Sequence, residues 1–375
     1  MAKFNTKLSD SQATEVTPVK ADDFDFDSYA EYSEELDSKC EKFWNSESGV
    51  VVYRRMRVAE CFSYGCRDMM SSLENQLGAL QMSMQFKADV PNFLEPWYGI
   101  GTIVSAYGSE YIWEKGSAPA LSPRFNSLDA VLNFDPVPVS QTDIGKHTLE
   151  MIEYFMDKTK GSLPVSFTDS QSPLNMSGHL LPLDQFFIHF FTEPEKVLLL
   201  FDRLADLSVE FNKAQKNLIG NSLVYPGHGF ASSRKWDGLG MSDDNILMVS
   251  PEQYSTLASP SAIKVCDHFG GTAFHSCGNW TGWIDSVLNI QGLRMVDAAL
   301  SPETDPGATD NLEIFQRFAH TGIVVNARIV GNPDTIRSQV ERLWVPGMKL
   351  VVVTYCNTPE EQNEAYNQIH ETCHE

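Results

Sequence analysis

A His-x-Cys pair and a later cysteine are the side chains in this sequence best suited to bind a soft metal ion. His275 and Cys277 follow the apolar run 272–274, and Cys356 comes shortly after the apolar run 350–353. In an extended chain residues i and i+2 point to the same side, so the imidazole and the thiol of the pair aim at one point. One nitrogen and two sulfur ligands suit zinc, and three protein ligands leave a fourth position for a substrate. The pattern therefore predicts a catalytic zinc site, with packing of the cysteines as small apolar residues as the alternative.

The elements that must position these residues follow from apolar periodicity beyond residue 164. Short strand-like runs occupy 165–167, 239–241, 272–274, 294–296, 323–325 and 350–353. Helical patterns occupy 194–212, 311–320, 333–343 and 359–370, and three of these four begin with proline, which is favoured in a first helical turn. Alternation of strands and helices predicts a parallel sheet. No Gly-x-Gly-x-x-Gly segment follows a strand, so a dinucleotide-binding fold is not supported.

Further polar residues follow these strands, where the active sites of barrel enzymes lie. Asp243 and Asp244 are candidate catalytic residues that could orient a substrate or hydrogen-bond the histidine, or simply cap the next segment. Arg328 can bind a substrate carboxylate or sulfonate through two parallel hydrogen bonds, or form a structural ion pair. Asn279 and His228 are further candidate substrate contacts, and His228 lies in a glycine-containing loop that could cover the site.

The N-terminal part of the chain has a different pattern. Residues 1–25 show little periodicity, and we expect them to be disordered. Residues 26–85 have mostly helical periodicity, interrupted by a short strand-like run. We therefore expect an N-terminal helical extension at 26–85 and a barrel at 86–375, with the alternative that the first strand lies near 50–56.

Composition restricts the class of protein and the kinds of partner. Apolar residues make up 42% of the 375-residue chain and the formal net charge is −22, which fits a globular protein and disfavours binding to nucleic acid or to an anionic membrane. No apolar run is long enough to span a bilayer, and the first residues do not resemble a secretory signal. The seven cysteines are therefore expected to be reduced thiols or metal ligands in a cytoplasmic protein.

Residues 239–254, Leu-Gly-Met-Ser-Asp-Asp-Asn-Ile-Leu-Met-Val-Ser-Pro-Glu-Gln-Tyr, together with the segment 275–279 resemble the uroporphyrinogen decarboxylase superfamily, and the resemblance extends over roughly residues 50–370. It implies a single (β/α)8 TIM barrel with an N-terminal helical extension. The chain departs from the true decarboxylases, because the place of their early two-arginine segment reads Met-Arg-Val-Ala-Glu-Cys at 56–61 and residues 98–105 contain no aspartate. The His-x-Cys pair and the late cysteine are instead similar to the zinc-dependent methyltransferase branch.

That branch implies an activity, a cofactor and a partner. Its members move a methyl group between a corrinoid, such as methylcobalamin, carried by a separate protein and a thiol, a methyl ether or a similar small molecule. The resemblance also implies that Glu303 is an exchangeable fourth zinc ligand and a catalytic residue, with a helix cap or a solvent-exposed side chain as the alternative. Two other hypotheses remain open: a metal-free porphyrinogen decarboxylase, and a non-catalytic barrel with a structural zinc ion.

The zinc hypothesis makes a geometric prediction. If His275, Cys277 and Cys356 are ligands, their ligand atoms lie within roughly 3–4.5 Å of one another, as tetrahedral bonds of about 2.0–2.3 Å require. A structure in which Cys356 lies in the apolar layer between the barrel and its helices would contradict this ligand set.

Overall fold

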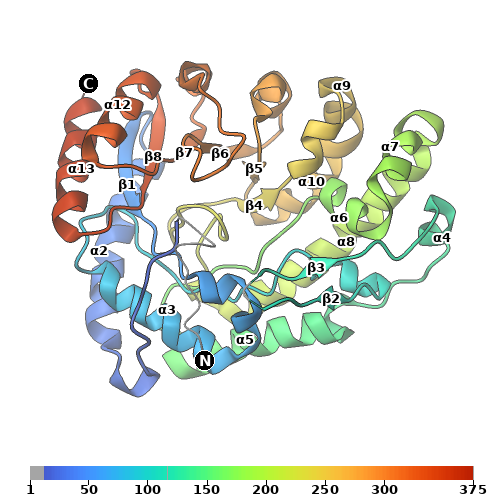
Figure 1. The fold of residues 1–375 in the computed structure, drawn as a ribbon, viewed down its shortest axis with the longest axis horizontal. Coiled ribbons are helices and arrows are strands. Elements are labelled where there is room, and N and C mark those ends of the chain that lie inside the picture. The colour runs from blue at the N-terminus through green and yellow to red at the C-terminus, as the bar shows by residue number, and fades with distance from the viewer. Residues whose placement is uncertain (1–11, 116, 375) are drawn as a thin grey trace.

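The computed structural model describes residues 12–115 and 117–374, and its centre is a six-stranded parallel sheet (Figure 1). The strands follow the order β1-β8-β7-β6-β5-β4. Their bounds are β1 Gly49–Arg54, β4 Leu239–Ser242, β5 Thr272–His275, β6 Leu293–Ala299, β7 Val324–Arg328 and β8 Lys349–Thr354, and a separate antiparallel pair comprises β2 Tyr111–Ile112 and β3 Ala120–Leu121. Five of the six strand-like runs predicted from the sequence lie on β4 to β8.

Two extended segments complete the ring between β1 and β4. The Asp89 amide donates a 2.8 Å hydrogen bond to the carbonyl of Val52 in β1, which joins the first segment to the sheet. That segment forms a parallel bridge to the second between Leu94 and Val165, and the second segment is bridged to β4 between Gln171 and Ser242. The sheet is therefore continued around a TIM-like barrel, and the predicted α/β barrel fold is confirmed.

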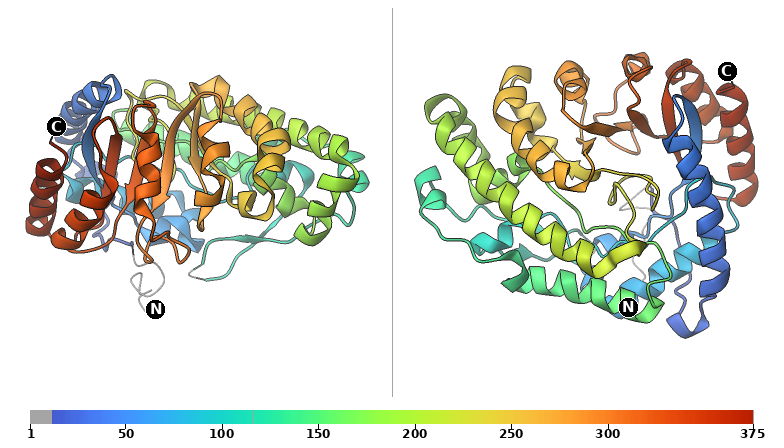
Figure 2. Two further views of the ribbon diagram at one scale, coloured as in Figure 1. Left: turned by 90° about the horizontal axis from the view of Figure 1, so that it is seen from above. Right: turned by 180° about the vertical axis from the view of Figure 1, so that it is seen from behind.

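Helices cover the outside of the barrel (Figures 1 and 2). Their bounds are α2 Phe26–Trp44, α3 Met69–Ser83, α4 Leu128–Leu132, α5 Asp143–Thr159, α6 Pro173–Leu180, α7 Leu183–Thr192, α8 Pro194–Ile219, α9 Pro251–Gln253, α10 Ser259–Cys266, α11 Ile284–Leu288, α12 Pro333–Leu343 and α13 Pro359–Thr372. Helices α8, α12 and α13 begin with the prolines that predicted them. No helix in the described ranges is both long and apolar enough to cross a membrane.

One predicted helix, 311–320, is a run of 3-10 turns at Leu312–Phe318 instead. Its buried apolar residues are Leu312, Phe315 and Phe318, which recur at every third position. A spacing of three residues matches the 3-10 helix, in which residues i and i+3 lie on one face. The apolar period therefore favours the tighter turn.

Along each strand, alternate residues face the inside and the outside of the barrel. Val51, Tyr53, Val351, Val353 and Tyr355 pack together with residues of the neighbouring strands in one cluster at the centre of the barrel. Their strand neighbours, including Val52 and Val352, belong to a second cluster that contains residues of α12 and α13. The first cluster is the inner core, and the second is the layer between the barrel and the helices, as the period of two in a strand requires.

The N-terminal part differs from expectation in two respects. Residues 12–25 are not disordered, because the Thr14 amide donates to the Arg57 carbonyl at 2.7 Å, the Val19 amide donates to the Glu74 carbonyl at 2.9 Å and Phe24 is buried; the rest of the predicted disordered start, 1–11, lies outside the described residues. The predicted extension 26–85 contains the helices α2 and α3, but β1 lies between them and pairs with β8. β1 is therefore the first strand of the sheet in the described residues, and the division into an extension and a barrel stays a prediction.

A buried carboxylate, Asp89, links the barrel to the last helix. Its oxygens accept hydrogen bonds from the Val52 amide at 3.0 Å and the Tyr366 hydroxyl at 2.7 Å, and one lies 2.9 Å from Nε2 of His370. Burial acts to raise the pKa of Asp89, but the His370 and Tyr366 hydrogen bonds outweigh burial and lower it. The ionised carboxylate therefore stabilises the packing of α13 on β1.

We predict that Asp89→Ala lowers the free energy of unfolding by about 2 kcal/mol or more, because it leaves one buried amide and two part-buried side-chain groups without their partner. Tyr366→Phe, which removes one donor, should cost about 1 kcal/mol. Since the folded-state pKa is lowered, the contribution of Asp89 is present above the ordinary aspartate pKa of about 3.9 and is lost as the pH falls through the folded-state value. Urea unfolding at pH 7 and below pH 4 measures both effects; equal loss at both pH values would contradict the role of the ionised form.

Candidate metal centre

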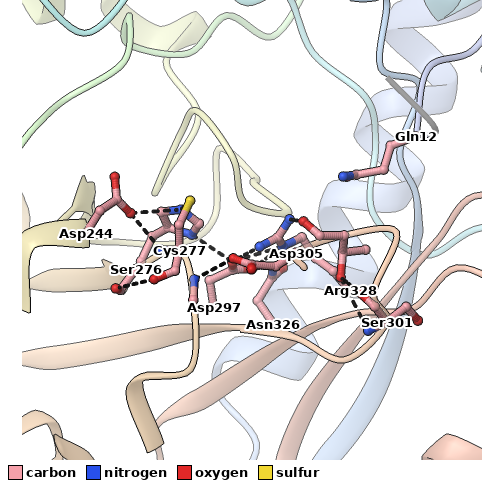
Figure 3. A network of polar contacts seen from close by, with 12 residues as sticks. Gln12, Asp244, Ser276, Cys277, Asp297, Ser301, Asp305, Asn326 and Arg328 are labelled. Atoms are coloured by element: carbon pink, nitrogen blue, oxygen red, sulfur yellow. Dashed lines mark hydrogen bonds and ion pairs between the residues drawn. The ribbon is translucent and has the colours of Figure 1, made fainter. Parts of the chain in front are cut away.

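Three side chains meet at the carboxyl ends of β4 and β5. His275 is the last residue of β5, Cys277 follows two residues later, and Asp244 follows β4. The Sγ of Cys277 lies 3.5 Å from Nε2 of His275, and the same nitrogen lies 3.8 Å from Oδ1 of Asp244. Among the described residues, Asp244, His275 and Cys277 form a group of possible metal ligands, because their ligand atoms all lie within 4.8 Å of one another. Figure 3 shows Asp244 beside Cys277.

Backbone hydrogen bonds hold the segment after β5 in place. The amide of Cys277 donates to Oδ1 of Asp244 at 2.6 Å, and the amide of Gly278 donates to Oδ2 of Asp305 at 2.5 Å. Gly278 has φ +79°, a left-handed conformation that glycine adopts without steric cost. The chain therefore turns away directly after Cys277, and the thiol of Cys277 stays exposed.

The buried carboxylate of Asp297 on β6 orients the imidazole of His275. Oδ2 of Asp297 lies 2.8 Å from Nδ1 of His275, and the carboxylate also accepts hydrogen bonds from Nδ2 of Asn326 at 2.7 Å and from Nε of Arg328 at 2.9 and 3.1 Å (Figure 3). A carboxylate that binds Nδ1–H fixes the tautomer whose Nε2 is free to bind a metal ion. Asp297 thus directs Nε2 of His275 toward Cys277 and Asp244.

The pKa values in this network follow from the same contacts. Burial acts to lower the pKa of His275, but the hydrogen bonds to Asp297 and Cys277 outweigh burial and raise it to about 10. Burial acts to raise the pKa of Asp297, and the charge of Arg328 with the hydrogen bond from His275 lowers it well below its ordinary value. The carboxylate is therefore ionised at neutral pH.

The two adjacent aspartates after β4, which were candidate catalytic residues, have different partners in the structure. Asp244 joins the cluster, whereas Asp243 is buried and accepts a 2.5 Å hydrogen bond from the Ser172 hydroxyl. Burial, as the largest effect, raises the pKa of Asp243 to about 7. Asp243 forms no side-chain cap on the turn that follows it, and Nδ1–H of His275 donates its hydrogen bond to Asp297 rather than to either predicted aspartate.

The predicted third zinc ligand, Cys356, lies elsewhere. Only 2% of its surface is exposed, and it packs in the layer between the barrel and the helices. Its neighbour Tyr355 belongs to the inner core, so alternation at the end of β8 turns Cys356 outward. The predicted convergence of His275, Cys277 and Cys356 is therefore not observed, and Asp244 takes the third place in the cluster.

Glu303, the predicted exchangeable ligand, is exposed and is not a member of the cluster. Its backbone carbonyl accepts a 3.3 Å hydrogen bond from Nε2 of Gln12. The role of its carboxylate as a metal ligand therefore stays a prediction.

The predicted substrate contacts have other partners in this structure. Arg328 forms the ion pair with Asp297, which is the structural alternative for this arginine. Nδ1 of His228 lies 3.0 Å from Oε1 of Glu95. The Asn279 side chain accepts hydrogen bonds from the amide and the hydroxyl of Thr281 and caps the next turn.

Sequence reasoning missed Asp297 and Asn326, although a signal for both was present. The strand-like run 294–296 is directly followed by Asp297, which lies two residues after the apolar Met295 on the same face of β6. Asn326 has the same relation to Val324 on β7. Extending the inner face of each strand by two residues would have found both.

The comparison with solved structures bears on the fold. No protein-family model matches the chain, and no curated protein matches its sequence. A solved structure described as a methyltransferase from Methanosarcina mazei superposes with a TM-score of 0.61, over 90% of this chain and 98% of the other, at 13% sequence identity. At this identity the match shows a shared fold.

We predict that Asp297→Asn weakens zinc binding by about 10–100-fold, because the amide no longer fixes the His275 tautomer. Asp285→Asn is the matched control, since Asp285 is exposed and pairs with Arg317 on the protein surface. A competition titration with a chromophoric chelator measures the two affinities. Equal affinity in the two variants would exclude the orienting role of Asp297.

Proposed function

We propose that the chain is a zinc-dependent methyltransferase that transfers a methyl group between a corrinoid on a separate protein and a thiol, a methyl ether or a similar small substrate. The observation that carries the proposal is the group of Asp244, His275 and Cys277 at the barrel mouth. The description of the matched structure as a methyltransferase with this fold supports the activity.

The donor set fits zinc. It provides one nitrogen, one sulfur and one oxygen ligand, all of which bind zinc in proteins, and three protein ligands leave a position for a substrate. A thiolate and a carboxylate together balance the charge of the ion. When bound, zinc supplies Lewis-acid activation of a substrate thiol or ether oxygen.

The residues around the group prepare it for this role. Asp297 holds His275 with Nε2 directed at the site, and Asp244 fixes the backbone of Cys277 by accepting its amide hydrogen. Cys277 is the exposed cysteine, whereas the six others are buried, so a substrate can approach its thiol. The inner core beneath is apolar and closely packed, and the fold should not depend on the metal ion.

The corrinoid is expected on a partner protein. The sequence contains no Asp-x-His-x-x-Gly segment of the kind that binds a corrinoid. The proposed partner is therefore a separate corrinoid protein that presents its cofactor at the barrel mouth, and the small methyl donor or acceptor binds beneath it.

We predict that the purified protein binds about one zinc ion per chain, and that Cys277→Ala loses both zinc and methyl transfer from methylcobalamin to a thiol while its thermal unfolding changes little. Cys356→Ala should retain zinc, because the structure places its thiol in the apolar layer. Elemental analysis and the absorbance change of methylcobalamin measure these outcomes. Retention of zinc by Cys277→Ala, or its loss by Cys356→Ala, would contradict the proposed ligand set.

A further inference from the structure

The second extended segment of the ring carries a carboxylate, Asp169, on the inner side of the barrel. Ala273 of β5 belongs to the inner core, so His275, two residues later, and Ser242, which is paired with it, also face inward. Gln171 is bridged to Ser242, and residues bridged in a parallel ladder point to the same side. Asp169 lies two residues before Gln171 and therefore shares this inner side.

A chain of side-chain hydrogen bonds connects Asp169 to the candidate metal centre. Oδ2 of Asp169 accepts a 3.0 Å hydrogen bond from Nε2 of Gln171. Oε1 of Gln171 accepts one at 2.9 Å from Nδ2 of Asn175 on α6, and the same Nδ2 donates to Oδ2 of Asp244 at 3.2 Å. Only two amide side chains separate the two carboxylates, so one small molecule can reach from Asp169 to the metal centre.

Asp169 is a buried carboxylate without a cationic partner. It is only 8% exposed, and its one hydrogen bond among the described residues is the bond to Oδ2. Two other carboxylates have direct partners, since Asp297 pairs with Arg328 at 2.9 Å and Glu95 lies 3.0 Å from Nδ1 of His228. Burying a carboxylate costs free energy unless a cation or several donors compensate it. The unpartnered Oδ1 of Asp169 therefore points to a ligand.

The charges around Asp169 favour a cation as this ligand. Burial raises the pKa of Asp169 and the charge of Asp244 adds to this effect, whereas the charges of His228 and His275 and the hydrogen bond from Gln171 act against it without cancelling it. A bound cation would supply the missing charge, and an anion would meet the two carboxylates instead. The formal net charge of −22 also attracts cations to the protein.

We propose that Asp169 binds the ammonium group of a small cationic substrate whose other end reaches the candidate metal centre. An amine would donate a charge-assisted hydrogen bond to Oδ1 of Asp169, and a quaternary ammonium group would be held by its charge. The cation site itself requires no metal ion, and only the placement of the reactive end rests on the proposed function.

Two thiols of the same shape test the proposal with the zinc-loaded protein: 2-(trimethylammonio)ethanethiol and its neutral carbon isostere, 3,3-dimethylbutane-1-thiol. The quaternary nitrogen cannot bind zinc, so a preference for the cation comes from the protein. Calorimetry gives the ratio of the two affinities. We expect this ratio to fall about tenfold or more in Asp169→Asn, because one close charge–charge attraction is lost. An unchanged ratio would overturn the proposal.

The Asn variant keeps the shape of the side chain and removes an uncompensated buried charge, so it should fold. Asp285→Asn is the matched control, since it removes the same charge at an exposed residue that pairs with Arg317. The general attraction of cations to the protein falls equally in both variants. A loss of the preference that is as large in Asp285→Asn as in Asp169→Asn would assign it to net charge and overturn the site.

Choline and its neutral isostere 3,3-dimethylbutan-1-ol, which carry no thiol, separate this inference from the proposed function. Preferential binding of choline to the chelator-treated protein, lost in Asp169→Asn, supports the cation site even if no thiol binds to zinc. Thiol binding that ignores the ammonium charge supports the metal centre and overturns the cation site.

Discussion

The buried negative charge of Asp297 organises the barrel mouth. A carboxylate that is 2% exposed needs compensating charge and hydrogen bonds, and these come from His275 on β5 and from Asn326 and Arg328 on β7. The requirement ties three adjacent strands together at their carboxyl ends. It directs the imidazole toward Cys277 and at the same time pairs with Arg328, so the candidate metal centre and the charge state of this arginine's surroundings depend on one group.

The barrel and the pairing of His275 with Cys277 could be predicted from the sequence because both follow from the alternation of side chains along a strand. A period of two places alternate side chains on one face, which correctly put His275 and Cys277 together. The same rule could not place Cys356, because the sequence does not show which residues of β8 face the inside of the barrel. The apolar run 350–353 is buried on both faces and therefore shows no alternation of apolar and polar residues.

The features that could not be predicted depend on contacts between segments that are far apart in the sequence. Asp244 meets Cys277 through a contact between the segments after β4 and β5, and the register of Ser242 beside His275 brings those segments together. Residues 12–25 likewise lack periodicity of their own, yet they are held by hydrogen bonds to residues some 40–55 positions further along the chain. Neither contact has a local signal, because both arise from tertiary packing.

The neighbouring residues Tyr355 and Cys356 show that the chemistry of the barrel mouth depends on the register of β8. Tyr355 faces the inner core and Cys356 the outer layer, so a register slip of one residue in β8 would exchange them. A single deletion within that strand would bring a soft thiol into the barrel in place of a phenol. One insertion or deletion could thus change which of these two side chains faces the barrel interior, without substitution of either residue.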